Sequence, residues 1–360
     1  MCETLHRARR SARAHLPVEA VLILLLGALM LFQGSSPASA CGSGTEAWPT
    51  KKWQVSEPAA LGLDADSLQA IAARARAIPG VTSIMVVRHG QVAMEEYFHG
   101  GSRGQPANVA SITKSVTSML VGIALGQGLI DSLDQPLIQL VPRAAPPPGR
   151  PAGTITIRQL LTMTSGLNEQ WSLVEPPQLR VTTPPGTTFR YSNEGVQFLI
   201  RAIGESSRES VLKFSRTWLW KPLGIDVDES RWPKFELNGS GDGAAGLSLT
   251  TRELGKLGLL ALRDGCWEGT QVVPAAYLKE AMQRQVQAGG PEPGERGYGF
   301  LFWITPSGLP YMAGQGGQYV VINAALDMVT VMTARGDAPD PDYIGQFRLV
   351  STAVAGAVRP

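Results

Sequence analysis

Histidine and cysteine are scarce in this sequence. Its 360 residues include 4 His and 3 Cys, and only His89 and His99 follow the first 40 residues. Both suit an exposed or structural position better than a catalytic one, so a histidine-based triad has no convincing member. A zinc hydrolase would need a cluster of His, Cys and Asp ligands, which the sequence does not contain. We therefore predict no metal ion and no cofactor.

Charge of one sign is not in excess either. The sequence has 32 Lys and Arg against 30 Asp and Glu, and the first 40 residues account for the difference because they hold four arginines and two glutamates. A domain that binds nucleic acid shows a clear basic excess. We predict no nucleic-acid partner.

A long hydrophobic run is also missing. The apolar stretch Val21–Phe32 is shorter than the roughly 20 residues that cross a membrane. It follows a basic stretch and precedes Ala38-Ser39-Ala40, which is the pattern of a cleaved signal peptide over residues 1–40. We therefore predict export, to the periplasm or to the bacterial cell envelope. An uncleaved anchor is the alternative.

Cys41 directly follows this cleavage site. It is a candidate for the lipidated first residue of a lipoprotein, although Ala38 is a weaker match than Leu in the lipidation signal. A plain mature N-terminus at Cys41 stays equally open. After cleavage only Cys41 and Cys266 remain, which is too few for a disulfide-rich scaffold.

Strand patterns occur near both ends of the remaining chain. After a leader over residues 41–57, the spacing predicts a helix over Leu61–Ile78 and a hairpin that turns at His89-Gly90. The later pattern predicts strands, followed by a closing helix over Asp342–Val354. These predicted strands are Ser83–Arg88, Gln91–Phe98, Tyr298–Ile304, Gln318–Asn323 and Met328–Ala334.

Residues 111–263 instead read as mostly helical, with long loops. We predict an α/β (α+β) fold in which residues 58–110 and 264–360 build one antiparallel sheet flanked by helices. The helical segment 111–263 is inserted between them. The active site is expected between the sheet and the inserted domain.

The first chemical motif is Ser111-Ile112-Thr113-Lys114. On a helix, Ser111 and Lys114 share a face, so the lysine amine would lie beside the serine hydroxyl. A serine becomes a nucleophile when a base takes its proton, and a lysine becomes that base when burial lowers its pKa. By itself the motif also fits a helix cap followed by an ordinary lysine.

Two further segments follow in a suggestive order. Tyr191-Ser192-Asn193 offers a phenol that can relay protons and an amide that can hold substrate. A buried tyrosine beside an asparagine that caps a helix would give the same sequence pattern. Gly314–Gln318 precedes a strand, where the Gln318 N–H could complete an oxyanion hole with that of Ser111. A glycine-rich bend is the alternative.

The ordered motifs identify a family resemblance. The chain resembles the class C β-lactamase-related serine hydrolases over roughly residues 55–355. That resemblance implies a β-lactamase/transpeptidase-like fold with an inserted helical domain, and it is strongest for the 6-aminohexanoate-dimer hydrolase and esterase branch. The segments that carry it are Ala110–Ser115, Ile155–Leu167, Pro185–Asn193, Gly246–Thr251 and Gly316–Gln318.

The third motif departs from the family pattern. β-Lactamases carry Lys-Thr-Gly there, and we match this triplet to Gln315-Gly316-Gly317. An uncharged glutamine cannot make the charge-assisted contact of that lysine with a substrate carboxylate. We therefore expect substrate contacts from Asn193, Gln315, Gly316 and Gly317 with neutral esters or amides rather than β-lactams.

The resemblance implies acyl transfer through Ser111, with Lys114 and Tyr191 as proton acceptors and small-molecule esters or amides as substrates. The alternatives are a β-lactamase or D-amino-acid peptidase, and a catalytically silent penicillin-binding-like protein. Trp171 follows the Thr-Ser-Gly-Leu segment and is a candidate for the substrate pocket, with ordinary packing as the alternative. The oligomeric state is left open.

Overall fold

A computed structural model describes residues 41, 48–145, 151–167, 179, 181–233, 242–289, 296–336 and 342–359. Residues 41–360 form one compact unit. The predicted signal peptide over residues 1–40 and Trp171 lie outside the described residues, so both expectations stay predictions. Within the described residues, no helix is long and apolar enough to cross a membrane.

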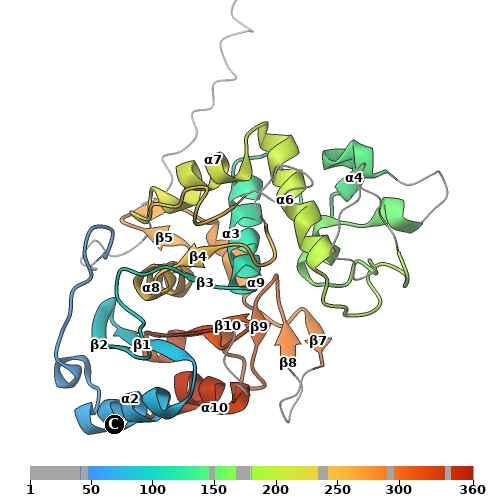
Figure 1. The fold of residues 1–360 in the computed structure, drawn as a ribbon. Helices are drawn as coiled ribbons and strands as arrows, with labels where there is room; N and C mark the ends of the chain where they lie inside the picture. Colours follow the sequence, from blue (N-terminus) through green and yellow to red (C-terminus); the bar gives the residue numbers. More distant parts are fainter. Residues whose placement is uncertain are drawn as a thin grey trace, which may run out of the picture. The chain divides into compact units, whose positions relative to one another are not determined.

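An antiparallel sheet of eight strands organises the described chain, in the order β2-β1-β12-β11-β10-β9-β8-β7 (Figure 1). Early and late parts of the sequence meet where β1 pairs with β12, as the strand patterns at both ends predict. The strands are β1 (Val81–Arg88), β2 (Gln91–Tyr97), β7 (Val286–Ala288), β8 (Arg296–Tyr298), β9 (Trp303–Ile304), β10 (Pro310–Gly314), β11 (Gln318–Asn323) and β12 (Met328–Ala334).

Two short ribbons complete the strands among the described residues. β3 (Ala107–Asn108) pairs with β4 (Ser248–Leu249), and β5 (Cys266–Trp267) pairs with β6 (Thr270–Gln271). β3 ends shortly before Ser111 in the chain, so its pairing with β4 holds the segment that leads into the first chemical motif.

The two faces of the sheet are covered by different helices (Figure 1). Side chains alternate along each strand, so Met85 and Val87 of β1 join one apolar core while Ile84 and Val86 join another. Helix α8 (Thr251–Leu262) packs on the first face, against β1, β11 and β12, and helices near the two chain ends pack on the second. These are α2 (Ala65–Ala77), α10 (Tyr343–Arg348), η6 (Leu349–Ala353) and η7 (Ala355–Ala357).

The remaining helices belong mostly to the segment after Ser111. Helix α3 is buried along nearly its whole length and packs against α6, α9 and β10. The helices are α3 (Ile112–Gly126), α4 (Leu137–Leu140), α5 (Ile157–Leu161), α6 (Asn193–Ser207), α7 (Val211–Ser215), α8 (Thr251–Leu262) and α9 (Ala275–Ala281), with short turns η1 (Pro58–Leu61), η2 (Pro142–Ala144), η3 (Pro151–Thr154), η4 (Arg216–Trp220) and η5 (Ala324–Leu326).

One sequence-based boundary needs correction. The predicted helix from Leu61 begins only at Ala65, because Gly62 adopts a left-handed conformation and the Asp64 side chain caps the Ser67 N–H. The predicted closing helix is present as α10, which continues without a break into the π-helical η6. Helix α8, the last helix of the predicted insertion 111–263, packs on the sheet.

The start of the described chain is bonded to the β5–β6 ribbon. Cys41 forms a disulfide with Cys266, with the two Cα atoms 5.7 Å apart. Nearby, the rings of Trp48 and Trp267 lie 5.1 Å apart, and the Trp267 indole N–H donates to Thr50 Oγ1 at 2.7 Å. Because lipidation of Cys41 would use the same sulfur atom, the disulfide and the lipid exclude each other.

Candidate active site

Ser111 is the N-cap residue of α3, but its hydroxyl does not cap the helix. A serine at this position normally accepts a hydrogen bond from a backbone N–H of the first turn. Here the hydroxyl accepts instead from Lys114 Nζ, at 2.9 Å. The i, i+3 spacing predicted this pairing, which leaves the Ser111 oxygen in contact with a potential base.

The backbone before Ser111 is held in an unusual conformation. Ala110 has φ 47°, in the left-handed region that costs a non-glycine residue about 1 kcal/mol. The Ala110 N–H donates to Asn108 Oδ1 at 2.7 Å, and the Val109 N–H donates to the Leu247 carbonyl at 2.9 Å. Surrounding contacts therefore maintain the strain, as is common beside catalytic groups.

Lys114 is almost fully enclosed, with 1% of its surface exposed. Its Nζ donates to the Ala244 carbonyl at 2.8 Å and lies 4.8 Å from the centre of the Tyr191 ring. Burial lowers the pKa of Lys114 to about 7, while the negative charge of Asp242 acts in the opposite direction. Near neutral pH, a large share of Lys114 is therefore a neutral amine that can accept a proton.

A turn around Asp242 supplies the second partner of Lys114. Asp242 Oδ1 accepts from the Ala244 and Ala245 N–H groups at 2.8 and 3.2 Å, and from Gln197 Nε2 of α6 at 2.6 Å. These bonds hold the Ala244 carbonyl where Lys114 reaches it. Sequence reasoning missed Asp242, because Gly and Asp in this stretch suggested only a loop.

Tyr191 lies in the wall of the same cavity as Ser111. Its loop is braced by the segment that contains Thr-Ser-Gly-Leu: the Arg190 N–H donates to the Met163 carbonyl at 2.7 Å, and the Gly186 N–H donates to the Thr164 carbonyl at 2.7 Å. This segment therefore positions Tyr191, which explains why it accompanies the other two motifs.

Aromatic side chains enclose the cavity around Tyr191. The Tyr191 ring stacks on Trp303 at 5.9 Å, with the planes 19° apart, and meets Tyr298 edge to face at 6.3 Å. The cavity has a volume of about 200 Å³ and is lined by Ser111, Tyr191, Arg296, Trp303, Tyr311, Ala313, Gly314, Gln315, Tyr319 and Phe347. Its size and walls suit a small, partly apolar group.

The third motif contributes different residues from those predicted. The cavity is lined by Ala313, Gly314 and Gln315, but not by Gly316 and Gly317. Of the predicted triplet Gln315-Gly316-Gly317, the structure therefore places only Gln315 in the cavity wall, directly after β10, a strand that the sequence analysis did not predict. Gly314 is needed there, because a Cβ atom would come within 2.2 Å of the Val109 carbonyl oxygen.

The Gln318 side chain bonds the neighbouring strand. It is buried, and its amide bonds the backbone of Ala334 in β12: Nε2 donates to the carbonyl oxygen, and Oε1 accepts from the N–H at 3.2 Å. Gln318 does not line the cavity. These bonds involve the side chain, so the role of the Gln318 backbone N–H as an oxyanion donor stays a prediction.

The Gln315 N–H is directed differently. The Gly314 carbonyl accepts from the Gly317 N–H at 3.4 Å, so it points toward the turn and β11. In a trans peptide the carbonyl and the next N–H point in opposite directions. The Gln315 N–H therefore faces the other edge of β10, where β9 pairs only with Pro310 and Tyr311.

The other predicted residues are more remote. Asn193 is the first residue of α6 and is partly exposed, but it does not line the cavity. His89 bonds Asp327 at the hairpin turn, and the His99 ring bonds the Val81 carbonyl. Within the described ranges, no group of three or more His, Cys, Asp and Glu side chains is placed to hold a metal ion.

Known proteins are similar to this chain in sequence and in fold. An uncharacterized protein of Alkalihalophilus pseudofirmus is 28% identical over 221 residues, which cover 55% of this chain and 63% of that protein. The 6-aminohexanoate-dimer hydrolase of Paenarthrobacter ureafaciens is 23% identical over 297 residues, covering 72% and 74%. This chain thus spans less than two thirds of the length of the first relative and about three quarters of the second.

A solved structure shows the same fold. A Bacillus anthracis protein provisionally described as a 6-aminohexanoate-dimer hydrolase superposes with a TM-score of 0.68, at 18% identity, over 90% of this chain and 92% of its own. The model of the family described as "Beta-lactamase" matches residues 68–355. This match spans most of the sequence and includes all three motifs, and the chain therefore belongs to the β-lactamase family of serine hydrolases.

Proposed function

We propose that this protein hydrolyses ester or amide bonds of small molecules through an acyl-enzyme intermediate on Ser111. The contact between Lys114 Nζ and Ser111 Oγ, at 2.9 Å inside a buried site, carries the proposal. A buried neutral amine within hydrogen-bond reach is the base that a serine nucleophile requires.

The proposed reaction has two halves. Ser111 Oγ attacks the substrate carbonyl carbon while its proton passes to Lys114 Nζ, and the bond to the leaving group then breaks. The leaving oxygen or nitrogen receives that proton from Lys114 or through the Tyr191 hydroxyl. A water molecule next attacks the acyl carbon and gives a proton to the same groups. The bond between the acyl carbon and Ser111 Oγ then breaks, the proton passes to Oγ, and the carboxylic acid product leaves.

The negative oxygen of each tetrahedral intermediate needs donors. We assign the Ser111 and Gln315 backbone N–H groups to this role, and the Gln318 N–H predicted from the sequence is the alternative second donor. Ser111 is the N-cap residue of α3, and the Gln315 N–H faces away from β11. Both residues line the cavity, so both N–H groups are near the position of the substrate carbonyl. No hydrogen-bond partner is found for either N–H among the residues that the structure describes. Such preorganised donors contribute strongly to acyl transfer.

The walls of the cavity bear on the substrate class. The cavity wall has Ala313 of β10 and, directly after that strand, the uncharged Gln315 rather than the lysine of the family pattern, which weakens the case for β-lactams. We therefore keep small esters or amides as the proposed substrates, with a short p-nitrophenyl ester hydrolysed faster than a chromogenic cephalosporin, a D-amino-acid anilide or a linear amide oligomer. A faster cephalosporin would instead favour the β-lactamase alternative.

A fluorophosphonate probe tests the nucleophile directly. We expect covalent labelling of the wild-type protein at Ser111, and loss of both labelling and ester hydrolysis by several orders of magnitude in Ser111→Ala. The exposed serine variant Ser230→Ala is the matched control and should keep both. Undiminished hydrolysis by Ser111→Ala would refute the mechanism, and a folded wild type that is never labelled would favour the silent binding protein.

Export to the cell envelope also remains part of the proposal. Disulfides persist in oxidising compartments outside the cytosol, so the bond between Cys41 and Cys266 supports export without a lipid on Cys41. Mass spectrometry of the protein isolated from its natural host tests this. We expect a chain starting at Cys41 with no lipid; a diacylglycerol on Cys41 would show that the disulfide does not form.

A further inference from the structure

The segment Gly246–Thr251 carries part of the family resemblance, yet the proposed mechanism gives it no role. Its first part is bonded to the chain around Ser111. The Leu247 carbonyl accepts from the Val109 N–H at 2.9 Å, and the Leu247 N–H donates to Thr113 Oγ1 at 3.3 Å. All three of these residues are buried. Leu247 therefore holds the chain on both sides of the nucleophile.

The Thr113 hydroxyl has a second partner, which is the Ala110 carbonyl. Thr113 Oγ1 donates to that oxygen at 2.7 Å, and the Thr113 N–H donates to it at 3.1 Å. A hydroxyl has one proton and can also accept, so Thr113 gives its proton to Ala110 and accepts from Leu247. Threonine often bonds an earlier carbonyl of its own helix, but here the bond from Leu247 also fixes the hydroxyl from outside the helix.

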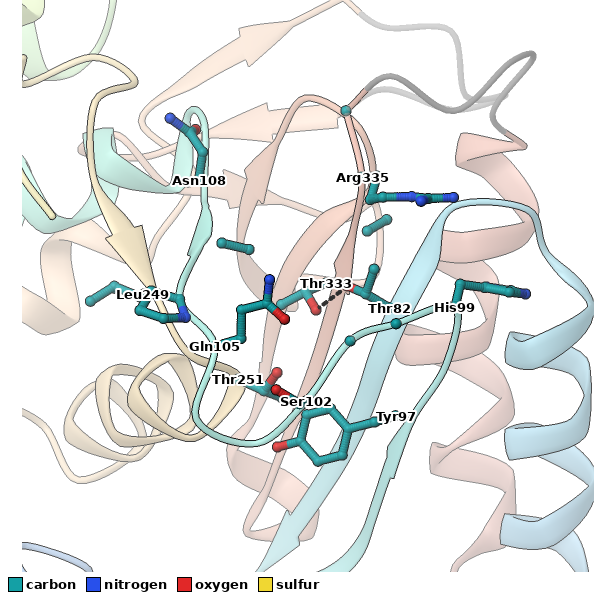
Figure 2. Close-up of a pocket in the computed structure, with 16 residues that line it drawn as sticks. Thr82, Tyr97, His99, Ser102, Gln105, Asn108, Leu249, Thr251, Thr333 and Arg335 are labelled. Carbon is teal, nitrogen blue, oxygen red and sulfur yellow. Dashed lines mark hydrogen bonds between the residues drawn. The ribbon is translucent and has the colours of Figure 1, made fainter. Parts of the chain in front are cut away.

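Ala110 is held at its other end by a different side chain. Its N–H donates to Oδ1 of Asn108, which lines a separate cavity of about 610 Å³ (Figure 2). The φ angle of Ala110 is 47°, which a residue with a side chain rarely adopts. Both backbone polar groups of Ala110 are thus bonded, the N–H to Asn108 and the carbonyl to Thr113. These bonds keep Ala110 in its left-handed conformation.

This arrangement determines where the Ser111 N–H points. The Ala110 carbonyl and the Ser111 N–H belong to one trans peptide, so they point in opposite directions. The carbonyl is turned toward Thr113 in the first turn of α3, and the N–H is therefore turned away from the helix. Ser111 lines the catalytic cavity. An N–H donor stabilises an oxyanion most when its direction is fixed before the reaction.

We propose that Thr113 is a positioning residue, which aims the Ser111 N–H at the substrate oxyanion through the Ala110–Ser111 peptide. This inference rests on the proposed function, in which that N–H stabilises the tetrahedral intermediate. Thr113 is buried and does not line the catalytic cavity, so it acts through the peptide and not on the substrate. Leu247 completes the arrangement, which gives the Gly246–Thr251 segment its role.

Thr113→Val tests the proposal in the full-length protein, because valine has a similar shape but no hydroxyl. With a short p-nitrophenyl ester, we expect kcat to fall about ten- to a hundredfold and KM to change less than about twofold, since the N–H acts on the transition state. Thr113→Ser keeps the hydroxyl, and its kcat should stay within about threefold of wild type. The acid limb of the pH profile should stay near pH 7 in both variants, because Lys114 keeps its surroundings.

A short trifluoromethyl ketone gives a second readout. Its adduct with Ser111 carries an alkoxide at the position of the oxyanion, so its inhibition constant should rise in Thr113→Val by about the factor by which kcat/KM falls.

Thr333→Val is the matched control. Thr333 is a buried threonine in the wall of the separate cavity (Figure 2), and its hydroxyl also has two partners, Thr82 and Ser83. This variant should unfold at a lower urea concentration than wild type, while its kcat and its inhibition by the ketone stay unchanged. A fall of kcat in Thr333→Val as large as in Thr113→Val would mean that lost stability is the cause, and the inference would be wrong.

Three other results would overturn the inference. They are a wild-type kcat in Thr113→Val, an unchanged inhibition constant of the ketone in that variant, and a Thr113→Ser variant that is as slow as Thr113→Val. If circular dichroism shows that Thr113→Val does not fold, Asn108→Leu decides instead, because Asn108 is exposed. It should lower kcat severalfold, whereas Asn108→Asp keeps an acceptor oxygen and should not; equal kcat values of these two variants would overturn the inference.

Failure of the proposed function gives a different result. In that case the wild type does not hydrolyse the ester, or Ser111→Ala hydrolyses it equally well. Hydrolysis that depends on Ser111 but not on the Thr113 hydroxyl would leave the proposed function standing and refute only the role of Thr113.

Discussion

Lys114 should lower the stability of this protein while it supports catalysis. Burial lowers its pKa from 10.5 to about 7, so between these pH values the unfolded chain holds a proton that the folded protein has released. The free energy of unfolding therefore rises with pH across this window. Below pH 7 it is lowered by the full amount that burial of Lys114 costs. The shift corresponds to a loss of about 4 kcal/mol at pH 7 and less than about 1 kcal/mol at pH 10.

The substitution Lys114→Met removes this ionisable group but keeps an unbranched side chain of similar length. It also leaves the Ala244 carbonyl without its donor, which costs about 1–3 kcal/mol. At pH 7 we expect the variant to be more stable than wild type by about 1–3 kcal/mol, and at pH 10 to have lost that advantage. Its hydrolytic activity should fall by several orders of magnitude at both pH values.

Urea unfolding followed by tryptophan fluorescence at pH 7 and pH 10 measures this difference. The decisive quantity is the change in relative stability between the two pH values, about 3 kcal/mol, because the lost hydrogen bond cancels from it. Lys221→Met replaces an exposed lysine and should show little change. A Lys114→Met variant whose relative stability is the same at both pH values would show that Lys114 does not titrate as described.

Three other predictions concern the surroundings of the site. Asp242→Asn keeps an acceptor oxygen but removes the negative charge that raises the pKa of Lys114. The acid limb of the pH profile of kcat/KM should therefore move to a lower pH than its wild-type position near pH 7. An acid limb at the wild-type position would contradict this. Cys266→Ser should lower the free energy of unfolding by about 2–5 kcal/mol, and equal urea midpoints for oxidised wild type and variant would argue against the bond. Gly317→Ala should lower kcat at least tenfold, because Gly317 has φ 100° and a Cβ atom there would meet Gln346 Oε1 at 1.8 Å; retained kcat would show that the turn before β11 tolerates movement.

Local rules in the sequence predicted much of the fold and the centre of the site. Strand alternation and turn residues indicated the β1–β2 hairpin and the pairing of early and late strands. The i, i+3 rule placed Lys114 beside Ser111, because both lie on one regular helix. These features depend on residues close together in the chain or on patterns repeated along a whole strand.

The missing parts depend on contacts between distant segments. β10 is short, contains Pro310 and Gly314, and has no clear alternation, so only its pairing with β11 makes it a strand. That omission left Ala313 and Gly314 out of the predicted cavity wall. The effect of Asp242 on Lys114 likewise arises only when the chain folds back across 128 positions, for which a single sequence contains no signal.

The disulfide between Cys41 and Cys266 has a consequence for damaged protein. It closes a covalent ring with a sequence separation of 225 residues, and both Ser111 and Tyr191 lie within that ring. A single cut in any surface loop of the ring leaves one cross-linked molecule rather than two fragments. The nucleophile and the strands β8–β12 then stay attached, so a nicked enzyme can keep its cleft together until a reductant reaches the sulfur atoms.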